Sequence, residues 1–390
     1  MITVEEALRA LFALVTPLPS EEVPLRHAAH RVLARDVTAR RDQPPFEASA
    51  MDGYAIHAAD HWQGATLTVI GESAAGHGWR GTLAQGQALR IFTGAPVPDG
   101  AGQVVIQENV TRHGDRITIT DAQDSGSNIR PKGGDFTQGT AITAPRRLTP
   151  TDIALLAAMN IARLPVTRKT VVAIIATGDE LVQPGDSPGP DQIIASNSYG
   201  LAALVEAEGA IARLLPIARD TVASLEQTFA LAQGADLIVT IGGASVGDHD
   251  LVGQVAQSLG MDRSFYKVAM RPGKPLMAGR LGKAAMIGLP GNPVSAMVCG
   301  HVFLLPVIRK MLGLGAHPAP LQTATLAHDI GANGPRAHYM RASLTAAGVT
   351  IFDRQDSSLL TVLAQANCLA LRPPHDPARK AGENVQVLPL

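Results

Sequence analysis

The segment AAMIGLPGNPVSA, at residues 284–296, constrains the fold more than any other part of the chain. Ala284–Leu289 has the apolar composition of a buried strand, the turn PGNP interrupts it, and an apolar run of helical length continues to about Leu312. Asn292 suits a helix N-cap, and Pro293 stands where proline is best tolerated, at the first helical position. Such a strand, turn and helix place backbone N–H groups at the carboxyl end of a sheet, where α/β proteins bind phosphate and other oxyanions. Taken alone, the segment fits a tight turn without a ligand equally well.

The same pattern recurs along the chain. Three other apolar, strand-like segments run into polar, glycine-rich loops: Thr170–Ala176, Asp236–Ile241 and Phe265–Met270. Helices are predicted between the strands, at Ser198–Glu208 (after the N-cap candidate Asn197), Val222–Gln233 and Leu251–Leu259, and a further strand at Leu214–Ala218. Apolar strands that alternate with helices indicate a parallel sheet covered on both faces. The strand exits of such a sheet open on one edge, so we expect four loops to converge on one crevice that forms a binding site.

Charged side chains gather in these loops. The expected crevice collects carboxylates at Asp179, Glu180, Asp220, Asp248 and Asp250, and cations at Lys267, Arg271 and Lys274. Carboxylates without cysteine suit a hard cation such as Mg²⁺ and not zinc. Lysine and arginine beside glycine amides suit phosphate or another tetrahedral oxyanion. The residues therefore predict a Mg²⁺-dependent reaction at a phosphate group, although any one of these charges alone would also fit a solvated loop.

The composition argues against several classes of function. A net charge of −1 and 4% aromatic residues do not give the basic, aromatic-rich surface of a nucleic-acid-binding protein. Two cysteines, Cys299 and Cys368, are too few for a disulfide framework and are expected to be reduced core residues. The N-terminus is acidic and amphipathic, unlike a signal peptide, and the apolar runs are broken by charges, proline or glycine before they reach membrane-spanning length. We expect a cytoplasmic protein that binds neither nucleic acid nor membrane.

Changes in composition and residue pattern along the chain predict a multidomain α/β plus β fold. Helices are expected at Val4–Leu14, Leu25–Asp36 and Leu148–Met159, and many short strands between residues 44 and 144. This gives an elongated helical platform (1–43 and 145–166) with an inserted β-rich module (44–144), a three-layer α/β domain (167–315) and a C-terminal β-barrel or sandwich (320–390). Strands are expected in the last domain at Tyr339–Leu344, Val349–Asp353, Cys368–Arg372 and Val385–Leu388.

A set of motifs follows in fixed order. They are SAMDGYA (49–55), FTGAPVP (92–98), RPKGGD (130–135), ATGDEL (176–181), SNSYGL (196–201), GGASVGDHD (242–250), MRPGKP (270–275) and GLPGNPVSA (288–296). Over essentially the whole length, the chain resembles the MoeA family of molybdopterin molybdenumtransferases, whose animal relative is the E domain of gephyrin. The GG-x-SVG and PGNP motifs alone also fit the related MogA-like adenylyltransferases, which have only the α/β domain. The motifs of the β module and the C-terminal β region point to MoeA.

The resemblance implies an activity and an assembly. The implied reaction is insertion of molybdate into adenylylated molybdopterin, with Mg²⁺-dependent hydrolysis that releases AMP and molybdenum cofactor. The implied assembly is a homodimer in which the β module of one protomer faces the α/β domain of the other. Transient contact with other enzymes of molybdenum cofactor biosynthesis is consistent with this reading. The alternatives are a molybdopterin adenylyltransferase and a catalytically silent, gephyrin-like scaffold.

Residue roles follow from the matched positions. Asp220 and Asp250 match acidic positions for the metal and the adenylate, while Ser245 and Glu180 match neighbouring catalytic positions in the loops of the α/β domain. On the β module the matched functional positions are Asp52, Thr93 and Asp135. Substrate-binding positions in the α/β loops are Gly178, Gly242, Gly243, Gly247, Lys267, Arg271, Gly273, Lys274, Pro275, Gly291 and Asn292. The molybdate pocket is expected to contain Lys274, Ser295, Arg341 and either Ser357 or Ser358.

Three positions depart from the usual family pattern. Arg271 stands where lysine is usual, which keeps the charge but replaces a point donor with a planar fork. Asp248-His249 replaces the commoner Glu-Ala, and Ala244 replaces a common valine.

Overall fold

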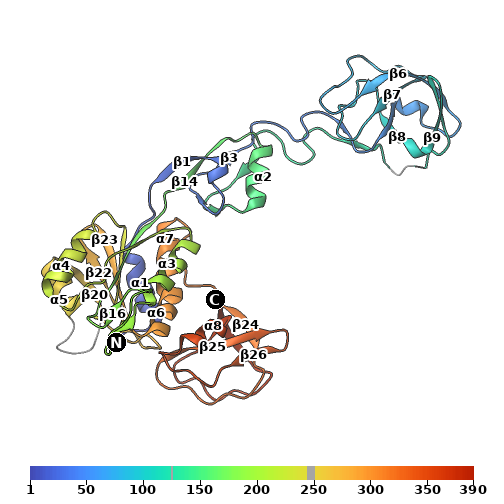
Figure 1. Cartoon of the computed structure of the whole chain (residues 1–390). Helices are drawn as coiled ribbons and strands as arrows, with labels where there is room; N and C mark the ends of the chain where they lie inside the picture. The colour runs from blue at the N-terminus through green and yellow to red at the C-terminus, as the bar shows by residue number, and fades with distance from the viewer. Residues whose placement is uncertain (124–125, 244–250) are drawn as a thin grey trace.

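The α/β domain is built on a six-stranded mixed sheet, seen in a computed structural model that describes residues 1–123, 126–243 and 251–390 (Figure 1). The strand order is β18-β15-β19-β23-β22-β20. The strands are β18 (Ile211–Leu214), β15 (Val171–Ala176), β19 (Leu237–Ile241), β23 (Ala284–Leu289), β22 (Met277–Leu281) and β20 (Asp262–Phe265). The first four are parallel, and β22 and β20 complete the sheet with antiparallel pairing. The predicted parallel core of the sheet is therefore confirmed.

Helices cover both faces of this sheet and give three layers. Along β15, Val172 and Ile174 pack into one apolar core, while Ala173 and Ile175 pack into another, as alternation along a strand requires. The helices are α3 (Asn197–Ala207), α4 (Val222–Leu231), α5 (Leu251–Ser258), α6 (Pro293–Cys299) and α7 (Leu305–Met311), with a π-helical turn η4 (Gly300–Leu304) joining the last two. The run Pro293–Met311 has the length and apolarity of a membrane span, but 78% of its most apolar window is buried in the protein. It is the central helix of the core.

Two predicted strands of this domain are wrong in detail. Phe265–Met270 is not one strand: β20 ends at Phe265, and β21 (Met270–Arg271) pairs with β25 (Ala337–Thr345) in the C-terminal domain. Leu214–Ala218 is also misplaced, because β18 ends at Leu214 and Ala218 makes only an isolated parallel bridge to Thr177. That bridge still brings the chain after β18 to the carboxyl edge of the sheet.

The N-terminal helix belongs to the α/β core. Thr3 caps α1 (Val4–Ala13) with a full capping box, in which its side chain accepts from the amide of Glu6 and its own amide donates to the Glu6 carboxylate. The apolar face of α1, including Leu8 and Leu11, is buried in the same cluster as the sheet and α7. The expectation that all of residues 1–43 belong to the platform is therefore wrong for this helix.

The platform is more sheet than helix. Its strands, in the order β1-β14-β2-β13, are β1 (Ser20–Pro24), β14 (Arg163–Thr167), β2 (Val32–Leu33) and β13 (Arg146–Arg147). The predicted helix Leu25–Asp36 is wrong, because only the 3₁₀ turn η1 (Leu25–His27) forms, and Val32 and Leu33 bury their side chains in strand β2. Helix α2 (Pro150–Ala158) is confirmed, with Thr149 at its N-cap and Asp152 completing a capping box.

The inserted module is a six-stranded β unit at the far end of the molecule (Figure 1). Its strands are β8 (Gln103–Ile106), β5 (Gly53–Ile56), β7 (Gln87–Ile91), β6 (Thr66–Ser73), β10 (Arg116–Ile119) and β9 (Val110–His113), with 3₁₀ turns η2 (Ala58–Asp60) and η3 (Gln107–Asn109). A hairpin at His113-Gly114-Asp115 joins β9 to β10, with Gly114 at φ 61°. Two short pairs lie along the connection to the platform: β3 (Val37–Thr38) with β12 (Ala141–Ile142), and β4 (Ala48–Ser49) with β11 (Ile129–Arg130).

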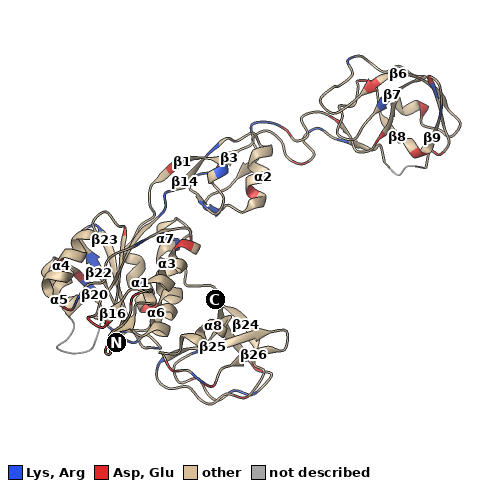
Figure 2. Ribbon diagram, in the orientation of Figure 1, with Lys and Arg blue, Asp and Glu red and all other residues tan. Residues whose placement is uncertain are grey.

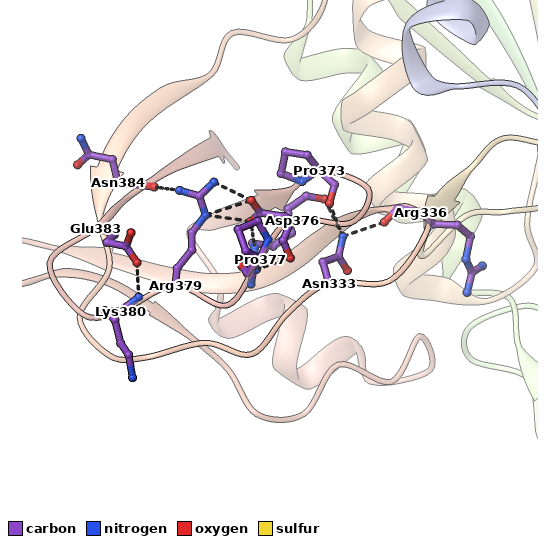
Figure 3. A network of polar contacts seen from close by, with 10 residues as sticks. Asn333, Arg336, Pro373, Asp376, Pro377, Arg379, Lys380, Glu383 and Asn384 are labelled. Carbon is purple, nitrogen blue, oxygen red and sulfur yellow. Dashed lines mark hydrogen bonds and ion pairs between the residues drawn. The ribbon is translucent and has the colours of Figure 1, made fainter.

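The C-terminal domain is a small barrel. Beside β25 it contains β24 (Gln322–Thr325), β26 (Gly348–Ile351), β27 (Cys368–Arg372), β28 (Asn384–Pro389) and helix α8 (Leu360–Gln365). Antiparallel pairing runs from β26 through β25, β27 and β28 to β24. A parallel bridge between Leu326 and Val349 then joins the end of β24 to β26 and closes the ring. Figure 3 shows the ion-pair network around Asp376 that ties the loops at one end of this barrel together.

Charges are spread over the whole length of the molecule. Figure 2 shows lysine and arginine interspersed with aspartate and glutamate in each part of the chain, in agreement with the net charge of −1. This distribution fits recognition by local sites and not by one long-range field.

A buried carboxylate joins the platform to the α/β domain. Glu208, at the C-terminal end of α3, is 8% exposed and pairs through Oε1 with Arg147 of β13 and through Oε2 with Arg309 of α7, whose Nη2 lies 2.8 Å away. Arg147 also donates to the Glu208 carbonyl at 3.0 Å. We expect Glu208→Gln to lower the free energy of unfolding by about 2 kcal/mol, less than for a fully buried pair because both arginines keep solvent contact.

Chemical denaturation of Glu208→Gln, with small-angle scattering on the folded protein, checks this expectation. The matched control is Glu206→Gln on the exposed face of the same helix, which should leave both readouts unchanged. Equal stabilities of the two variants would show that the Glu208 pairs do not hold the two units together.

Candidate functional site

A cavity of about 640 Å³ lies at the carboxyl edge of the α/β sheet. The loops after β15, β19 and β23 line it, with Asp220 contributed by the segment after β18. The predicted residues that line it are Gly178, Glu180, Asp220, Gly242, Gly243, Pro275, Gly291, Asn292 and Ser358. The structure thus brings together loops that are more than 100 residues apart in sequence, as the strand pattern predicts.

Glycine is required at this edge because the backbone turns through conformations that side chains disfavour. Gly178 has φ 147°, and a Cβ atom there would lie 2.3 Å from Oε2 of Glu180. Gly243 has φ 64°, and its Cβ atom would lie 2.2 Å from a methyl carbon of Val252. The absence of side chains leaves the backbone open to a ligand, as in other anion-binding loops.

One side of the cavity is acidic. The amide of Asp220 donates to Oδ1 of Asp179 at 3.2 Å, and Arg219 holds the same loop by donating to the carbonyls of Asp179 and Leu181 at 2.9 and 3.3 Å. Burial, together with the nearby negative charges of Asp179 and Glu180, raises the pKa of Asp220. A carboxyl pKa rises when burial and like charges both disfavour the ionised form. In the part of the chain that is described, no three acidic, histidine or cysteine side chains are arranged to hold a metal by themselves.

Part of the cavity wall is apolar. It comes from β16 (Leu181–Val182) and its partner β17 (Ile193–Ile194), which form a small parallel pair beside the sheet. Ile193 and Ile194 remain 58% and 38% exposed although they are large aliphatic side chains. The cavity therefore offers backbone amides, carboxylates and an aliphatic surface.

Asn197 lines the cavity in a way that sequence reasoning missed. It was expected to cap a helix, but Ser196 occupies the N-cap and Asn197 is the first residue of α3. Its Nδ2 donates to the carbonyl of Gly291 at 2.7 Å and so ties α3 to the PGNP turn. The motif SNSYGL was a signal for this residue, but no feature of that motif distinguishes a cap from a cross-link between loops.

The C-terminal domain reaches the cavity through one loop. Asn292 occupies the N-cap of α6 as predicted, but its side chain does not cap the helix and donates to Oγ of Ser357 at 3.2 Å. The amide of Val294 donates to the carbonyl of Ser357 at 3.1 Å. Ser358 lines the cavity, and its hydroxyl donates to Asp356 at 2.6 Å.

Arg341 supports this loop from behind. It is 1% exposed, and its guanidinium donates to Oε1 of Gln355 at 3.1 Å and to the carbonyls of Asp356 and Arg354 at 2.9 and 3.3 Å. Burial lowers its pKa. Ser295 is also buried, at 3% exposure, so both residues lie in the wall behind the lining of the cavity.

The loop that carries the predicted cations Lys267, Arg271 and Lys274, called the basic loop, lies between the α/β domain and the C-terminal domain. Gly273, at φ 108°, packs so closely that a Cβ atom would lie 2.5 Å from the sulfur of Cys299. Arg271 and Lys274 are exposed, and the ammonium of Lys267 lies 5.4 Å from the centre of the Tyr266 ring. Pro275, the neighbour of Lys274, is the residue of this loop that lines the cavity, and Lys267, Arg271 and Lys274 are not among the described lining residues.

The β module carries a separate pair of predicted residues. Oδ1 of Asp52, just before β5, accepts from both the amide and the hydroxyl of Thr93, each at 2.7 Å. These two hydrogen bonds lower the pKa of Asp52, so it is a carboxylate at neutral pH. Asp135 is exposed, and its amide donates to the carbonyl of Gln43 at 2.9 Å. Within one chain, the module lies far from the α/β domain (Figure 1).

Part of the predicted site lies outside the described residues. Residues 244–250 are not among the described residues. This range contains the predicted site residues Ser245, Gly247 and Asp250 and the departures from the family pattern at Ala244, Asp248 and His249.

Comparisons with known proteins cover the whole chain. The MoeA N-terminal region (domain I and II) matches residues 2–160, the probable molybdopterin binding domain matches residues 173–310, and the MoeA C-terminal region (domain IV) matches residues 323–390. The crystal structure of the molybdopterin biosynthesis moeA protein from Pyrococcus horikoshii OT3 is similar over 100% of both chains, with a TM-score of 0.86 and 28% identity.

Curated relatives agree with these matches. The molybdopterin molybdenumtransferase of a Nostoc species is 37% identical over 100% of this chain and 94% of its own length. That of Haemophilus influenzae is 34% identical over 100% of this chain and 99% of its own length. With three family regions in order and relatives matched from end to end, the chain belongs to the MoeA family of molybdopterin molybdenumtransferases.

Proposed function

We propose that the protein inserts molybdate into adenylylated molybdopterin and releases AMP and molybdenum cofactor in a Mg²⁺-dependent hydrolysis. The observation that carries the proposal is the cavity at the sheet edge, where glycine-rich loops face the carboxylate of Asp220. Backbone amides at such loops suit the phosphates of an adenylate, and the aliphatic wall formed by Ile193 and Ile194 suits a heterocyclic ring.

The acidic side of the cavity fits Mg²⁺. This cation is usually bound by one or two carboxylates together with substrate phosphates, so a closed set of three protein ligands is not required. Asp220 would hold it, because its carboxylate lines the cavity and lies close enough to Asp179 and Glu180 for their charges to add to the burial that raises its pKa. When bound, Mg²⁺ would neutralise charge that develops on the phosphate during hydrolysis. Asp250 is proposed as its second ligand.

The basic loop fits molybdate. Among the described residues, Arg271 and Lys274 form no ion pair, so their donors are available to a tetrahedral oxyanion. Ser358 adds a hydroxyl at the edge of the cavity. Arg341 is assigned to hold the loop of Ser357 and Ser358 in place, and Ser295 lies buried in α6.

A homodimer would complete the site. Asp52 and Thr93 form a prepared acceptor pair, but in one chain the module that carries them extends away from the cavity (Figure 1). In a two-fold dimer, the module of one protomer would meet the cavity of its partner. The long platform between the two units supports this arrangement, because it separates the two halves of one site.

Turnover of adenylylated molybdopterin tests the proposed reaction. AMP release should require Mg²⁺ and should rise when molybdate is added, and the product should activate a molybdenum-free molybdoenzyme. Tight binding of the adenylate with no AMP release under any of these conditions would contradict the proposed reaction.

Subunit mixing tests the shared site. Asp52→Asn and Asp220→Asn dimers should each keep only a small residual activity, whereas random exchange at equal concentrations should restore about one quarter of the wild-type activity, because half the dimers are mixed and each holds one intact site. Mixing Asp52→Asn with Thr93→Val is the matched control and should restore none, since both changes fall in the same half of the site. Restoration in the control, or none in the first mixture, would exclude the shared site.

A further inference from the structure

We propose that Arg90 is a positioning residue that holds the Asp52–Thr93 pair of the β module in its working geometry. The inference rests on the proposed function, in which this pair faces the substrate. Arg90 lies on β7, directly opposite Tyr54 of β5 in the register of the sheet. It belongs to none of the positions singled out from the sequence.

The guanidinium of Arg90 contacts two aromatic rings. Its central carbon lies 5.1 Å from the centre of the Tyr54 ring and 4.7 Å from that of Phe92. Tyr54 follows Asp52 by two residues, and Phe92 immediately precedes Thr93. One planar cation therefore contacts both chain segments that supply the pair, and such contacts stabilise by roughly 0.5–1 kcal/mol each at partly exposed sites.

Hydrogen bonds from Arg90 tie the backbone on both sides of Gly53, directly and through Gln107. Its Nη1 donates to the carbonyl of Gly53 at 3.2 Å, and its Nη2 donates to Oε1 of Gln107 at 2.7 Å. The amide of Gln107 in turn donates to the carbonyl of Asp52 at 3.0 Å. The peptide units that precede and follow Gly53 are thus both tied, directly or through Gln107, to one side chain.

The contacts of Arg90 with Tyr54, Phe92, Gly53 and Gln107 form a frame around the Asp52–Thr93 pair. This frame leaves one carboxylate oxygen of Asp52 for a ligand. Both contacts with Thr93 fall on Oδ1 of Asp52, and Oδ2 has no hydrogen-bond partner in the described part of the chain. Arg90 forms no ion pair among the same residues, so its charge is not consumed by a salt bridge with Asp52. The arrangement fixes the direction of the free oxygen and does not occupy it.

Lysine cannot replace arginine in this role. The ammonium group of lysine lacks the flat face that stacks on two rings and the fork that reaches two acceptors at once. Arg90→Lys therefore keeps the charge but removes the frame, which makes it the informative substitution.

Hydrogen exchange tests the frame without reference to turnover. In Arg90→Lys the amide of Thr93, which is bonded to Asp52, should exchange at least about tenfold faster than in the wild type. The matched control is Arg112→Lys in the β9–β10 hairpin, where Arg112 donates to the carbonyl of Gly114, and it should leave exchange at Thr93 unchanged. Unchanged exchange in Arg90→Lys, with the fold intact by circular dichroism, would overturn the inference.

A double-mutant cycle tests the catalytic consequence. Arg90→Lys should lower kcat for AMP release about tenfold with little change in KM, since a misplaced group costs rate more than binding. In the Asp52→Asn background the same change should cost nothing more, because the group that it positions is already lost. Additive losses would mean that Arg90 acts independently of Asp52 and would overturn the proposal.

The outcomes separate this inference from the proposed function. A wild-type protein without molybdate-dependent AMP release would contradict the proposed function, while exchange at Thr93 still decides whether Arg90 forms the frame. An active wild type with Asp52→Asn impaired and Arg90→Lys unimpaired would overturn only the role of Arg90.

Discussion

Asp220→Asn is expected to lower Mg²⁺-dependent AMP release at least about 100-fold and to leave the fold intact. The substitution removes one negative charge with almost no change in volume. It acts where Asp179 and Glu180 already disfavour a further ionised group, so the folded protein tolerates the neutral side chain. Initial rates measured across a range of Mg²⁺ concentrations give the result. The matched control is Glu226→Gln on α4, an exposed carboxylate at the opposite edge of the sheet, which should keep full activity.

The pH dependence of the wild-type enzyme gives a second check on Asp220. Because burial and neighbouring carboxylates raise the pKa of Asp220, it takes up a proton at a higher pH than an ordinary aspartate as the solution is acidified. Mg²⁺ competes with that proton, so raising the Mg²⁺ concentration should move the acid limb of the wild-type activity to lower pH. An acid limb that does not respond to Mg²⁺, or an Asp220→Asn protein with more than about one tenth of wild-type activity, would remove Asp220 from the metal site.

The two acidic parts of the proposed site have opposite electrostatic character. Hydrogen bonds from Thr93 lower the pKa of Asp52, whereas burial and like charges raise that of Asp220. Carboxylates with pKa values pushed apart usually serve different roles. Asp52 fits an acceptor that stays ionised. Asp220 fits a metal ligand, because a bound cation would offset its negative charge and those of its neighbours. A shared site would bring these two types of carboxylate to the same substrate.

The sheet was predictable because its strands are buried on both faces. Ala284–Leu289 coincides with β23, and Asp236–Ile241 differs from β19 by one residue. A short, continuous apolar run of this kind indicates a strand that is buried on both faces, and the glycine-rich loop after it marks where the strand ends. The convergence of the loops followed from parallel topology and needed no information about individual contacts.

Pairing between distant segments was not predictable. The apolar run Phe265–Met270 looks like one strand, but its two ends pair with different domains, β20 with β22 and β21 with β25. Leu25–Asp36 has helical spacing, yet pairing of Val32 and Leu33 with other strands outweighs that local preference. Periodicity reports which face of an element is apolar, and it does not report which partner covers it.

The same limit explains what was missed in the site. Asn197 and Arg90 act by linking segments that are 94 and 17 residues away, respectively. Their residue types are common in helix starts and strands, so nothing local marks them. Arg341 was expected from the family resemblance in the molybdate pocket, and its described contacts are with the loop that carries Ser357 and Ser358.

Asp376→Asn is expected to destabilise the C-terminal barrel by about 3–5 kcal/mol, because it leaves Arg372 as a buried charge without its carboxylate. The side chains of Arg372 and Asp376 are 2% and 4% exposed, and Arg379 donates to Asp376 at 2.7 Å from a second side (Figure 3). Hydrogen bonds from Arg379 and Arg372 lower the pKa of Asp376, so its stabilisation is present above the ordinary aspartate pKa and is lost as the pH falls through the lowered value. Urea unfolding with hydrogen exchange in β27 and β28, at neutral and acid pH, measures both effects.

Asp329→Asn, which removes an exposed pair with Lys380, is the control and should leave the unfolding midpoint unchanged. Similar midpoints for the two variants at neutral pH would contradict the expectation, since burial is what separates them.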